Sequence, residues 1–297
     1  MRQRYETVRL KPRTIAFINV MNTIIEEYQA ANLVLTVRQL YYQLVARGVI
    51  QNDDKAYANV KNVANKARLA GLMDWDAIED RVRAFRTNRH YSDARDCMQA
   101  AANSYYKDRW TDQPSRVFVI VEKDALFGVL NPVCREYDVP LLAARGYPSS
   151  TVLRDFARKH IMGYCEAYRQ TPVILHFGDH DPSGIDMSRD LQERIALFSE
   201  ELGAEIIFKR VALNMDQIEI LKPPPNPAKM TDSRVGDYIN KYGPESWELD
   251  AVDPIQLQNE LRDEIIPYIV NEDAWNKKAK EIELGRRKIQ FVQNLCF

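Results

Sequence analysis

Four short apolar segments alternate with helix-like stretches in the middle of the chain, and this alternation restricts the fold more than any other feature. The segments, which begin after Pro114, are RVFVIVE, VPLLAARG, TPVILHFGDHD and AEIIFKRVAL. Each has the length and apolar content of a strand that is buried in a sheet. Strands that alternate with helices form a parallel sheet whose faces are covered by those helices. We therefore predict an α/β fold for this region.

The N-terminal part has apolar residues at helical spacing instead. RTIAFINVMNTIIEEYQA predicts one helix, and a second begins at Thr36, where Gln39 completes a capping box and Gly48 marks the end. DKAYANVKNVANKARLAG predicts a third helix, and DWDAIEDRVRAF a further one from Asp74. We expect an α-rich N-terminal part in front of the sheet.

The second and third of these helices, joined by a short turn, are typical of a helix-turn-helix. Lys61, Lys66 and Arg68 on the third helix are then candidates for binding DNA phosphates. Residues 1–110 carry 18 Lys and Arg against 12 Asp and Glu, whereas the rest carries 23 against 30. A basic part suits a polyanion and an acidic part suits metal ions. A plain helical bundle with a chance asymmetry of charge fits the same observations.

The cysteines and the apolar runs bear on the compartment. Cys97, Cys134, Cys165 and Cys296 lie far apart and form no CxxC pair, which favours reduced thiols over a zinc site. No apolar run is long enough to cross a bilayer, and MRQRYETVRLKPR lacks the apolar core of an export signal. We expect a cytoplasmic protein that does not contact a membrane.

The pattern weakens after residue 215. LKPPPNPAKMTDSR holds four prolines and is predicted to be irregular. A helix is expected after Pro254, and the basic tail WNKKAKEIELGRRKIQ has a helical pattern. The length of 297 residues allows two domains. We divide the chain into a helical part, 1–110, a sheet domain, 111–215, and an extension, 216–297, that completes the sheet domain or forms a dimer interface.

Acidic residues stand at the ends of two predicted strands. Glu122 ends the first, and Asp179 and Asp181 end the third, where they point the same way in an extended chain. Lys123 should then point away from Glu122, and His180 away from the two aspartates. Carboxylates gathered at one sheet edge repel one another unless a cation bridges them, and oxygen ligands suit Mg²⁺ or Mn²⁺. Alternatively, DHDPSG is simply an Asx-Pro turn.

Two adjacent tyrosines occupy different faces of the predicted second helix. Tyr41 belongs to an apolar stripe of residues at i, i+3, i+4, i+7 and i+8 and should be core. Tyr42 lies about 100° further round the helix, and Arg38, four residues earlier, can be its neighbour. Tyr42 is therefore either a nucleophile beside a cation or a boundary aromatic whose hydroxyl is in water.

The motifs VIVEKDALF, GYPSSTVLRDF and PVILHFGDHDPSGIDM together resemble a Toprim domain, the metal-binding fold of topoisomerases, bacterial primases and several nucleases. A glutamate on the first strand and a DxD pair on a later one are its signature. In particular, the chain resembles the A subunit of topoisomerase VI and the related meiotic double-strand-break transesterase, which join a winged-helix domain to a Toprim domain. That family has an R-x-x-Y-Y motif, which RQLYY, Arg38 to Tyr42, matches.

The resemblance implies that Tyr42 attacks a phosphodiester of double-stranded DNA and becomes covalently linked to it. It also implies that Glu122, Asp179 and Asp181 hold Mg²⁺ or Mn²⁺. Arg38 is expected to stabilise the phenolate or the charge on phosphorus. In the family the tyrosine of one subunit acts with the Toprim domain of its partner, so a homodimer would cut both strands.

Two further functions stay open. In one, a metal-dependent Toprim nuclease uses water and Tyr42 is only structural; in the other, a DNA-binding regulator no longer catalyses. The A subunit of topoisomerase VI works with an ATPase, and this chain has no Gly-rich ATP loop. A separate ATPase or other partner subunit is therefore a candidate partner. Residues 216–297 match nothing in the family.

Overall fold

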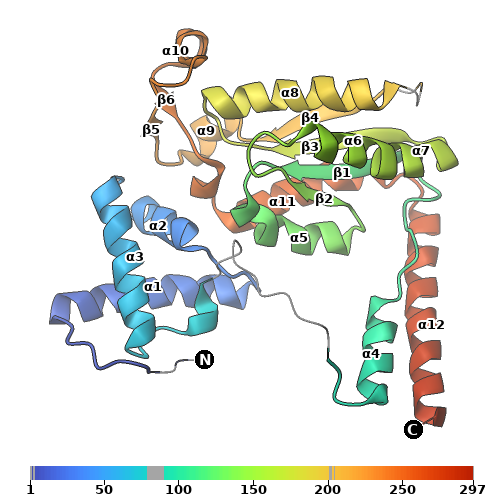
Figure 1. Cartoon of the computed structure of the whole chain (residues 1–297), viewed down its shortest axis with the longest axis horizontal. Coiled ribbons are helices and arrows are strands. Elements are labelled where there is room, and N and C mark those ends of the chain that lie inside the picture. Colours follow the sequence, from blue (N-terminus) through green and yellow to red (C-terminus); the bar gives the residue numbers. More distant parts are fainter. Residues whose placement is uncertain (1, 3, 79–89, 201–202, 204, 297) are drawn as a thin grey trace.

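A four-stranded parallel sheet lies in the computed structural model, which describes residues 2, 4–78, 90–200, 203 and 205–296 (Figure 1). The strands lie in the order β2-β1-β3-β4, and every neighbouring pair runs parallel. Their bounds are β1 Ser115–Val121, β2 Leu141–Ala143, β3 Thr171–Phe177 and β4 Ile207–Ala212. The predicted α/β class with a parallel sheet is confirmed.

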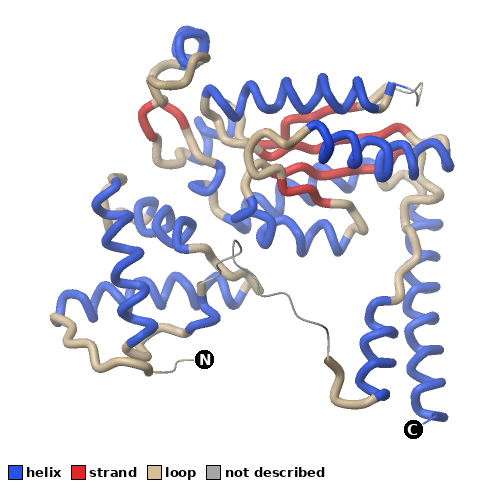
Figure 2. Tube along the Cα trace, viewed as in Figure 1, coloured by secondary structure: helices blue, strands red, loops and turns tan. Residues whose placement is uncertain are grey.

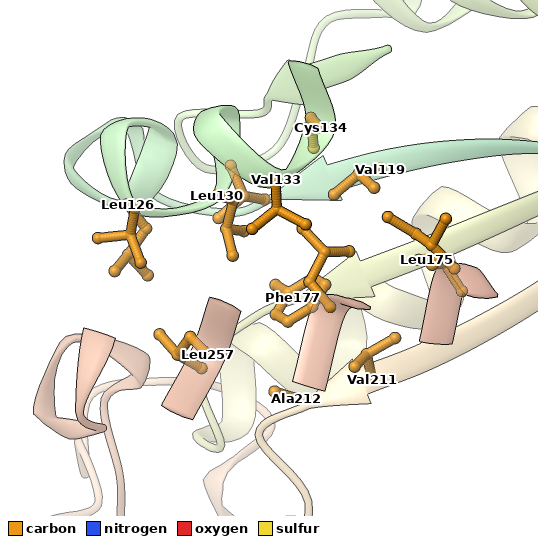
Figure 3. Packing of buried hydrophobic residues seen from close by; sticks show 14 of the residues in the cluster. Val119, Leu126, Leu130, Val133, Cys134, Leu175, Phe177, Val211, Ala212 and Leu257 are labelled. Carbon is orange, nitrogen blue, oxygen red and sulfur yellow. The ribbon is translucent and has the colours of Figure 1, made fainter. Parts of the chain in front are cut away.

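Helices cover both faces of the sheet because successive strand residues point to opposite sides. On one side, Val119 of β1 packs in a cluster with α5 (Phe127–Glu136) and α11 (Pro254–Ile265), as Figure 3 shows. On the other side, its neighbour Phe118 packs in a cluster that includes α8 (Pro182–Phe198). Burial of these apolar side chains supplies the main driving force for folding of the sheet region.

The segment predicted as one long helix before β3 is helical throughout, with an irregular middle. α6 (Ser150–Asp155) passes into a π-helical stretch, Phe156–Met162, and then into α7 (Gly163–Tyr168). Ser149 caps its start, since its hydroxyl accepts a hydrogen bond of 3.3 Å from the Val152 N–H.

Three N-terminal helices pack around a second apolar core. They are α1 Pro12–Ala30, α2 Val37–Ala46 and α3 Asp54–Leu69. The predicted capping box of α2 is confirmed, because Thr36 and Gln39 exchange side-chain to backbone hydrogen bonds. A 3₁₀ turn, Trp75–Ala77, lies where a helix is expected from Asp74, and the later part of that expected helix, from residue 79, lies outside the described residues.

α4 (Ala94–Ser104) lies beside the C-terminal helix α12 (Glu272–Cys296), away from α1–α3 (Figure 1). The Gln293 side chain donates a hydrogen bond of 2.9 Å to the Arg95 carbonyl. Tyr105 packs so closely on Gly285 that a Cβ there would lie 2.2 Å from its ring. The last part of the predicted N-terminal domain thus packs on the C-terminal helix, which confirms the helical pattern of the tail.

The proline-rich segment was predicted to be irregular, and at one point that prediction is wrong. β5 (Asn226–Pro227) pairs antiparallel with β6 (Glu245–Ser246) in a two-stranded sheet (Figure 2). Proline is tolerated because only one side of each strand is paired there. α9 (Met215–Leu221) and α10 (Val235–Tyr242) flank β5, and the helix expected after Pro254 is confirmed as α11.

Three of the four cysteines have side chains that the structure describes, and none of these three is in a disulfide. Cys97, Cys134 and Cys165 are free thiols. Burial raises the pKa of the Cys134 thiol to about 12, so it stays protonated and unreactive at neutral pH. Among the described residues, no helix has both the length and the apolar character that a membrane span requires.

A buried histidine on β3 makes stability depend on pH. Burial, aided by the charge of Arg210, lowers the pKa of His176 to about 3, whereas an unfolded histidine titrates near 6.5. Below pH 6.5 the unfolded chain therefore takes up a proton that the folded chain does not. Through this group, the free energy of unfolding should fall by about 1.4 kcal/mol for each pH unit below 6.5. Above pH 6.5 the stability that depends on the neutral His176 ring is fully present.

Urea titrations of the wild type and of His176→Asn at pH 6.8 and pH 5.5 measure this contribution. The variant is expected to lose about 1 kcal/mol less than the wild type over this interval. His160→Asn changes an exposed histidine and should behave as the wild type does. If the free energy of unfolding depends on pH equally in the wild type and in His176→Asn, the His176 ring has the same pKa in the folded and the unfolded chain, and the prediction is wrong.

Candidate functional site

The carboxyl ends of β1 and β3 open into a pocket of about 560 Å³. Glu122 follows β1, and Asp179 and Asp181 follow β3. All three acidic residues line the pocket, together with Arg38, Lys123, Glu248 and Asp250. The structure thus brings together the acidic residues that the sequence assigned to strand ends, because parallel strands end at the same edge of a sheet.

Each of the three acids has its own backbone contact. The Glu122 Oε2 atom accepts a hydrogen bond of 2.9 Å from the Asp179 N–H. Asp181 begins α8, and its Oδ1 accepts a hydrogen bond of 2.6 Å from the Gly184 N–H. Asp181 is thus the N-cap of α8, a local structural role for DHDPSG, and the same residue also lines the pocket.

Burial and nearby charges shift the pKa values of Glu122 and Asp179. Burial raises the pKa of Glu122 to about 7, and the negative charge of Asp179 adds to the shift. Burial also raises the pKa of Asp179, but the ammonium of Lys123 opposes that rise. The pocket is thus short of positive charge at neutral pH, and a cation that enters it would favour the ionised carboxylates.

The prediction that Lys123 points away from Glu122 is wrong, because the two residues line the same pocket and the Lys123 charge acts on the Glu122 carboxylate. The Lys123 Nζ lies 2.8 Å from Asp179 Oδ2. Alternation of side chains applies only within an extended strand, and β1 ends at Val121. His180, by contrast, points away from the pocket as expected, and its Nδ1 lies 2.7 Å from the Tyr238 hydroxyl.

Glu248 and Asp250 are pocket residues that sequence reasoning missed. An isolated antiparallel bridge pairs Trp247 with His180, through hydrogen bonds of 2.8 and 2.9 Å. The Leu249 N–H then donates a hydrogen bond of 2.8 Å to Asp179 Oδ1. Two acids spaced like the DxD pair, in WELDA, were the only local signal of this arrangement.

Arg38 reaches the pocket from the N-terminal helices. Its guanidinium forms an ion pair with Glu248, and its Nε lies 3.6 Å from Asp250 Oδ2. Burial would raise the pKa of Glu248, but Lys123 and Arg38 together keep it below its usual value. Arg38 also lies 5.8 Å from the centre of the Tyr42 ring, so the predicted neighbours are in contact.

Tyr42 is more buried than its helical position predicted. Its side chain is 2% exposed, against 5% for the core residue Tyr41. The segment around β5 covers it, and the Asn226 side chain donates a hydrogen bond of 3.3 Å to the Tyr42 hydroxyl. Neither a hydroxyl in water nor an exposed nucleophile describes this state, because a segment distant in sequence closes over the helix. Burial, with the charge of Glu248, raises the pKa of Tyr42.

The basic residues expected on the third helix lie on α3, outside the pocket lining. Lys61 and Lys66 are exposed, and the Lys61 ammonium lies 4.6 Å from the centre of the Tyr57 ring. Arg68 is half-buried, with its guanidinium 5.4 Å from the Trp75 ring. Lys61 and Lys66 are therefore at the surface, whereas Arg68 packs on an aromatic ring.

The turn after β3 is held by a half-buried arginine, Arg210, which sequence reasoning also missed. Arg210 on β4 donates hydrogen bonds of 3.0 Å to the carbonyls of Gly178 and Gly184. Gly178 lacks a side chain where space is short, since a Cβ there would lie 3.1 Å from Glu122 Oε2. Arg210 and Gly178 thus fix the loop that carries Asp179 and leave room beside the Glu122 carboxylate.

The fold and the pocket together describe a parallel α/β protein with a cluster of acidic residues at the carboxyl edge of its sheet. In the part of the chain that the structure describes, no three His, Cys, Asp or Glu side chains are gathered closely enough to hold a metal ion as they lie. Comparison with models of protein families and with curated protein sequences gives no match to this chain.

Proposed function

We propose that the protein cleaves double-stranded DNA in a reaction that depends on Mg²⁺ or Mn²⁺, and that Tyr42 is the nucleophile. The observation that carries the proposal is the meeting of two motifs in one pocket. Arg38, from RQLYY, and the acids Glu122, Asp179 and Asp181, from the strand ends, line the same cavity. The proposed fold is a Toprim domain, with α2 and α3 as the helix-turn-helix of a winged-helix domain.

The donor atoms of the pocket fit a hard divalent cation. Glu122, Asp179 and Asp181 offer carboxylate oxygens, the ligands that Mg²⁺ and Mn²⁺ prefer. The glycine at 178 leaves space beside the Glu122 carboxylate. When bound, the ion would neutralise part of the phosphodiester charge and polarise the reacting phosphate.

The side chains would act on the phosphodiester as follows. The Tyr42 hydroxyl loses its proton and its oxygen bonds to phosphorus, while the bond from phosphorus to the leaving deoxyribose oxygen breaks. The leaving oxygen takes up a proton and becomes a free hydroxyl end, so the number of phosphate ester bonds is unchanged. Arg38 stabilises the negative charge that develops on the phosphate or on the phenolate.

Attack by Tyr42 requires a rearrangement of the segment around β5. The hydroxyl is covered, and its raised pKa disfavours the phenolate while it stays covered. DNA that displaces Asn226 and competes with Glu248 for Arg38 would expose the hydroxyl beside a cation. The resemblance implies that the tyrosine acts with the partner's metal site, and the same displacement would free α2 to reach a second subunit in a homodimer.

The burial of Tyr42 also favours an alternative, in which the pocket is a nuclease and water attacks the phosphodiester. The acids of the pocket would have the same role, and Tyr42 would only support the packing of α2. The two mechanisms differ in their product, because only the first leaves DNA covalently attached to protein.

The test is cleavage of end-labelled duplex DNA by the full chain, with Mg²⁺ or with EDTA, followed by denaturation. Cleaved DNA that stays with the denatured protein only in the presence of Mg²⁺ supports transesterification. Cleavage without attachment supports the nuclease. Binding without any cleavage under either condition would reject both and would leave a DNA-binding regulator.

The exposed lysines of α3 should contribute to DNA affinity through phosphates. If Lys61 and Lys66 each contact one phosphate, the double variant Lys61→Ala/Lys66→Ala should make the negative slope of log affinity against log salt shallower by about 1.8. Fluorescence anisotropy with labelled duplex at several salt concentrations measures the slope. Lys209→Ala, on β4 and paired with Glu264, is the control and should leave it unchanged. An unaltered slope in the double variant would remove α3 from the DNA surface.

A further inference from the structure

The Lys123 ammonium is surrounded by carboxylates from two separate parts of the chain. Nζ lies 2.8 Å from Asp179 Oδ2, 3.0 Å from Glu248 Oε2 and 3.5 Å from Asp250 Oδ2. Asp179 follows β3, whereas the other two acids follow β6. Several carboxylate oxygens around one positive charge resemble the surroundings of a bound cation.

Asp250 has a feature that these ion pairs do not explain. Its side chain is 1% exposed, and its Oδ1 atom has no hydrogen-bond partner among the described residues. A buried carboxylate oxygen without a partner is costly, because it has lost its water. Asp250 lines the pocket, and one of its two carboxylate oxygens is thus left without a donor or a cation in the described part of the chain.

The charges around Lys123 are not balanced. Asp179, Glu248 and Asp250 carry three negative charges, while Lys123 and Arg38 supply two positive ones. A divalent ion in place of the ammonium would supply the missing charge. The same exchange would give the unpartnered Asp250 oxygen a ligand role.

We propose that Asp179, Glu248 and Asp250 form a second cation position, which the Lys123 ammonium fills in the wild type and which a divalent cation fills when that ammonium is removed. The protein would then combine one divalent ion with one fixed ammonium, where two-metal enzymes use two ions. Lys123 is 24% exposed at its side chain, so its ammonium can also meet a phosphate oxygen. The identity of the first ion rests on the proposed function; the second position does not.

Binding of Mn²⁺ to the full chain, followed by electron paramagnetic resonance, tests this inference without DNA. The wild type and Lys123→Arg, which keeps a cation, are expected to bind one ion. Lys123→Ala is expected to bind two, and Lys123→Ala/Asp250→Asn to return to one. Mn²⁺ should also raise the melting temperature of Lys123→Ala more than that of the wild type, since the ion replaces a lost counter-charge.

The outcomes separate this inference from the proposed function. If the wild type binds no ion and Lys123→Ala binds one that Asp250→Asn removes, the second position stands and the first metal site fails. If Lys123→Ala gains no ion, or if its extra ion survives Asp250→Asn, the inference is wrong. Should Lys123→Ala fold only with Mn²⁺, that dependence supports the inference, and unfolding that Mn²⁺ does not reverse contradicts it.

Discussion

Tyr42→Phe should leave no DNA attached to the denatured protein, whereas Tyr41→Phe should leave the attached fraction close to that of the wild type. The substitution removes only the oxygen that would bond to phosphorus, and phenylalanine fills the same buried space. Loss of the hydrogen bond from Asn226 should lower the free energy of unfolding by about 1 kcal/mol, too little to unfold the chain. The measurement is the radioactivity that migrates with protein after cleavage of labelled DNA with Mg²⁺.

Tyr41→Phe is a matched control because the two tyrosines are adjacent, buried and in contact. Their ring centres are 5.1 Å apart, and the Tyr41 hydroxyl donates a hydrogen bond of 2.7 Å to Asn52. Each variant therefore loses one hydroxyl that is hydrogen-bonded to an asparagine side chain, and the Tyr41 hydroxyl also lies 3.3 Å from the Asp53 carbonyl. If DNA attachment persists in Tyr42→Phe and disappears in Tyr41→Phe, the nucleophile is Tyr41 and the assignment to Tyr42 is wrong. Unattached cleavage in both would favour water.

The parts of the fold that local patterns control could be predicted from the sequence. The runs VFVIV of β1 and VIL of β3 are apolar at every position because both faces of the sheet are covered. The start of α2 depends on two side chains three residues apart, Thr36 and Gln39, so it is visible in the sequence. The meeting of Glu122 with the DxD pair follows from topology, since strands that run parallel end at one edge.

The parts that could not be predicted depend on contacts between distant segments. Glu248 lies beside Asp179 because a single bridge pairs Trp247 with His180. A single bridge produces no repeating pattern in the sequence, so it could not be predicted. Tyr42 is buried because Asn226, far along the chain, closes over α2. Lys123 turns toward the acids because the strand ends one residue before Glu122. Helical or strand periodicity describes which face a residue occupies, and it cannot tell what covers that face.

These distant contacts give residues 216–297 a role in the site. Asn226 covers the proposed nucleophile, Glu248 holds Arg38, and Asp250 completes the surroundings of Lys123. The segment thus links the helices that carry Tyr42 to the sheet edge that carries the acids. A displacement of residues 216–297 would change both the exposure of the Tyr42 side chain and the net charge of the residues that line the pocket.

Asp179→Asn should reduce the rate of DNA cleavage on the order of a thousandfold. Asp179 contacts most of the pocket: its N–H reaches Glu122, its Oδ1 accepts from Leu249, and its Oδ2 pairs with Lys123. Asparagine keeps the shape and the acceptor for Leu249 but removes the charge that would hold a divalent ion. Loss of about 4 kcal/mol of transition-state stabilisation corresponds to that factor.

Single-turnover cleavage of labelled duplex at saturating Mg²⁺ measures the effect, and Mn²⁺ binding to the same variant should weaken in parallel. Asp186→Asn is the matched control, because Asp186 is also an aspartate near the start of α8 but pairs with Arg189 and Arg234 outside the pocket lining. Its cleavage rate should stay within about twofold of the wild type, because this half-exposed ion pair lies outside the pocket lining. A thousandfold loss in Asp179→Asn with unchanged Mn²⁺ binding would mean that the carboxylate positions Lys123 and not the metal. Wild-type cleavage in Asp179→Asn would remove this pocket from the reaction, because among the contacts of the described residues Asp179 is the pocket residue that bonds to both Glu122, through its N–H, and Lys123, through its carboxylate.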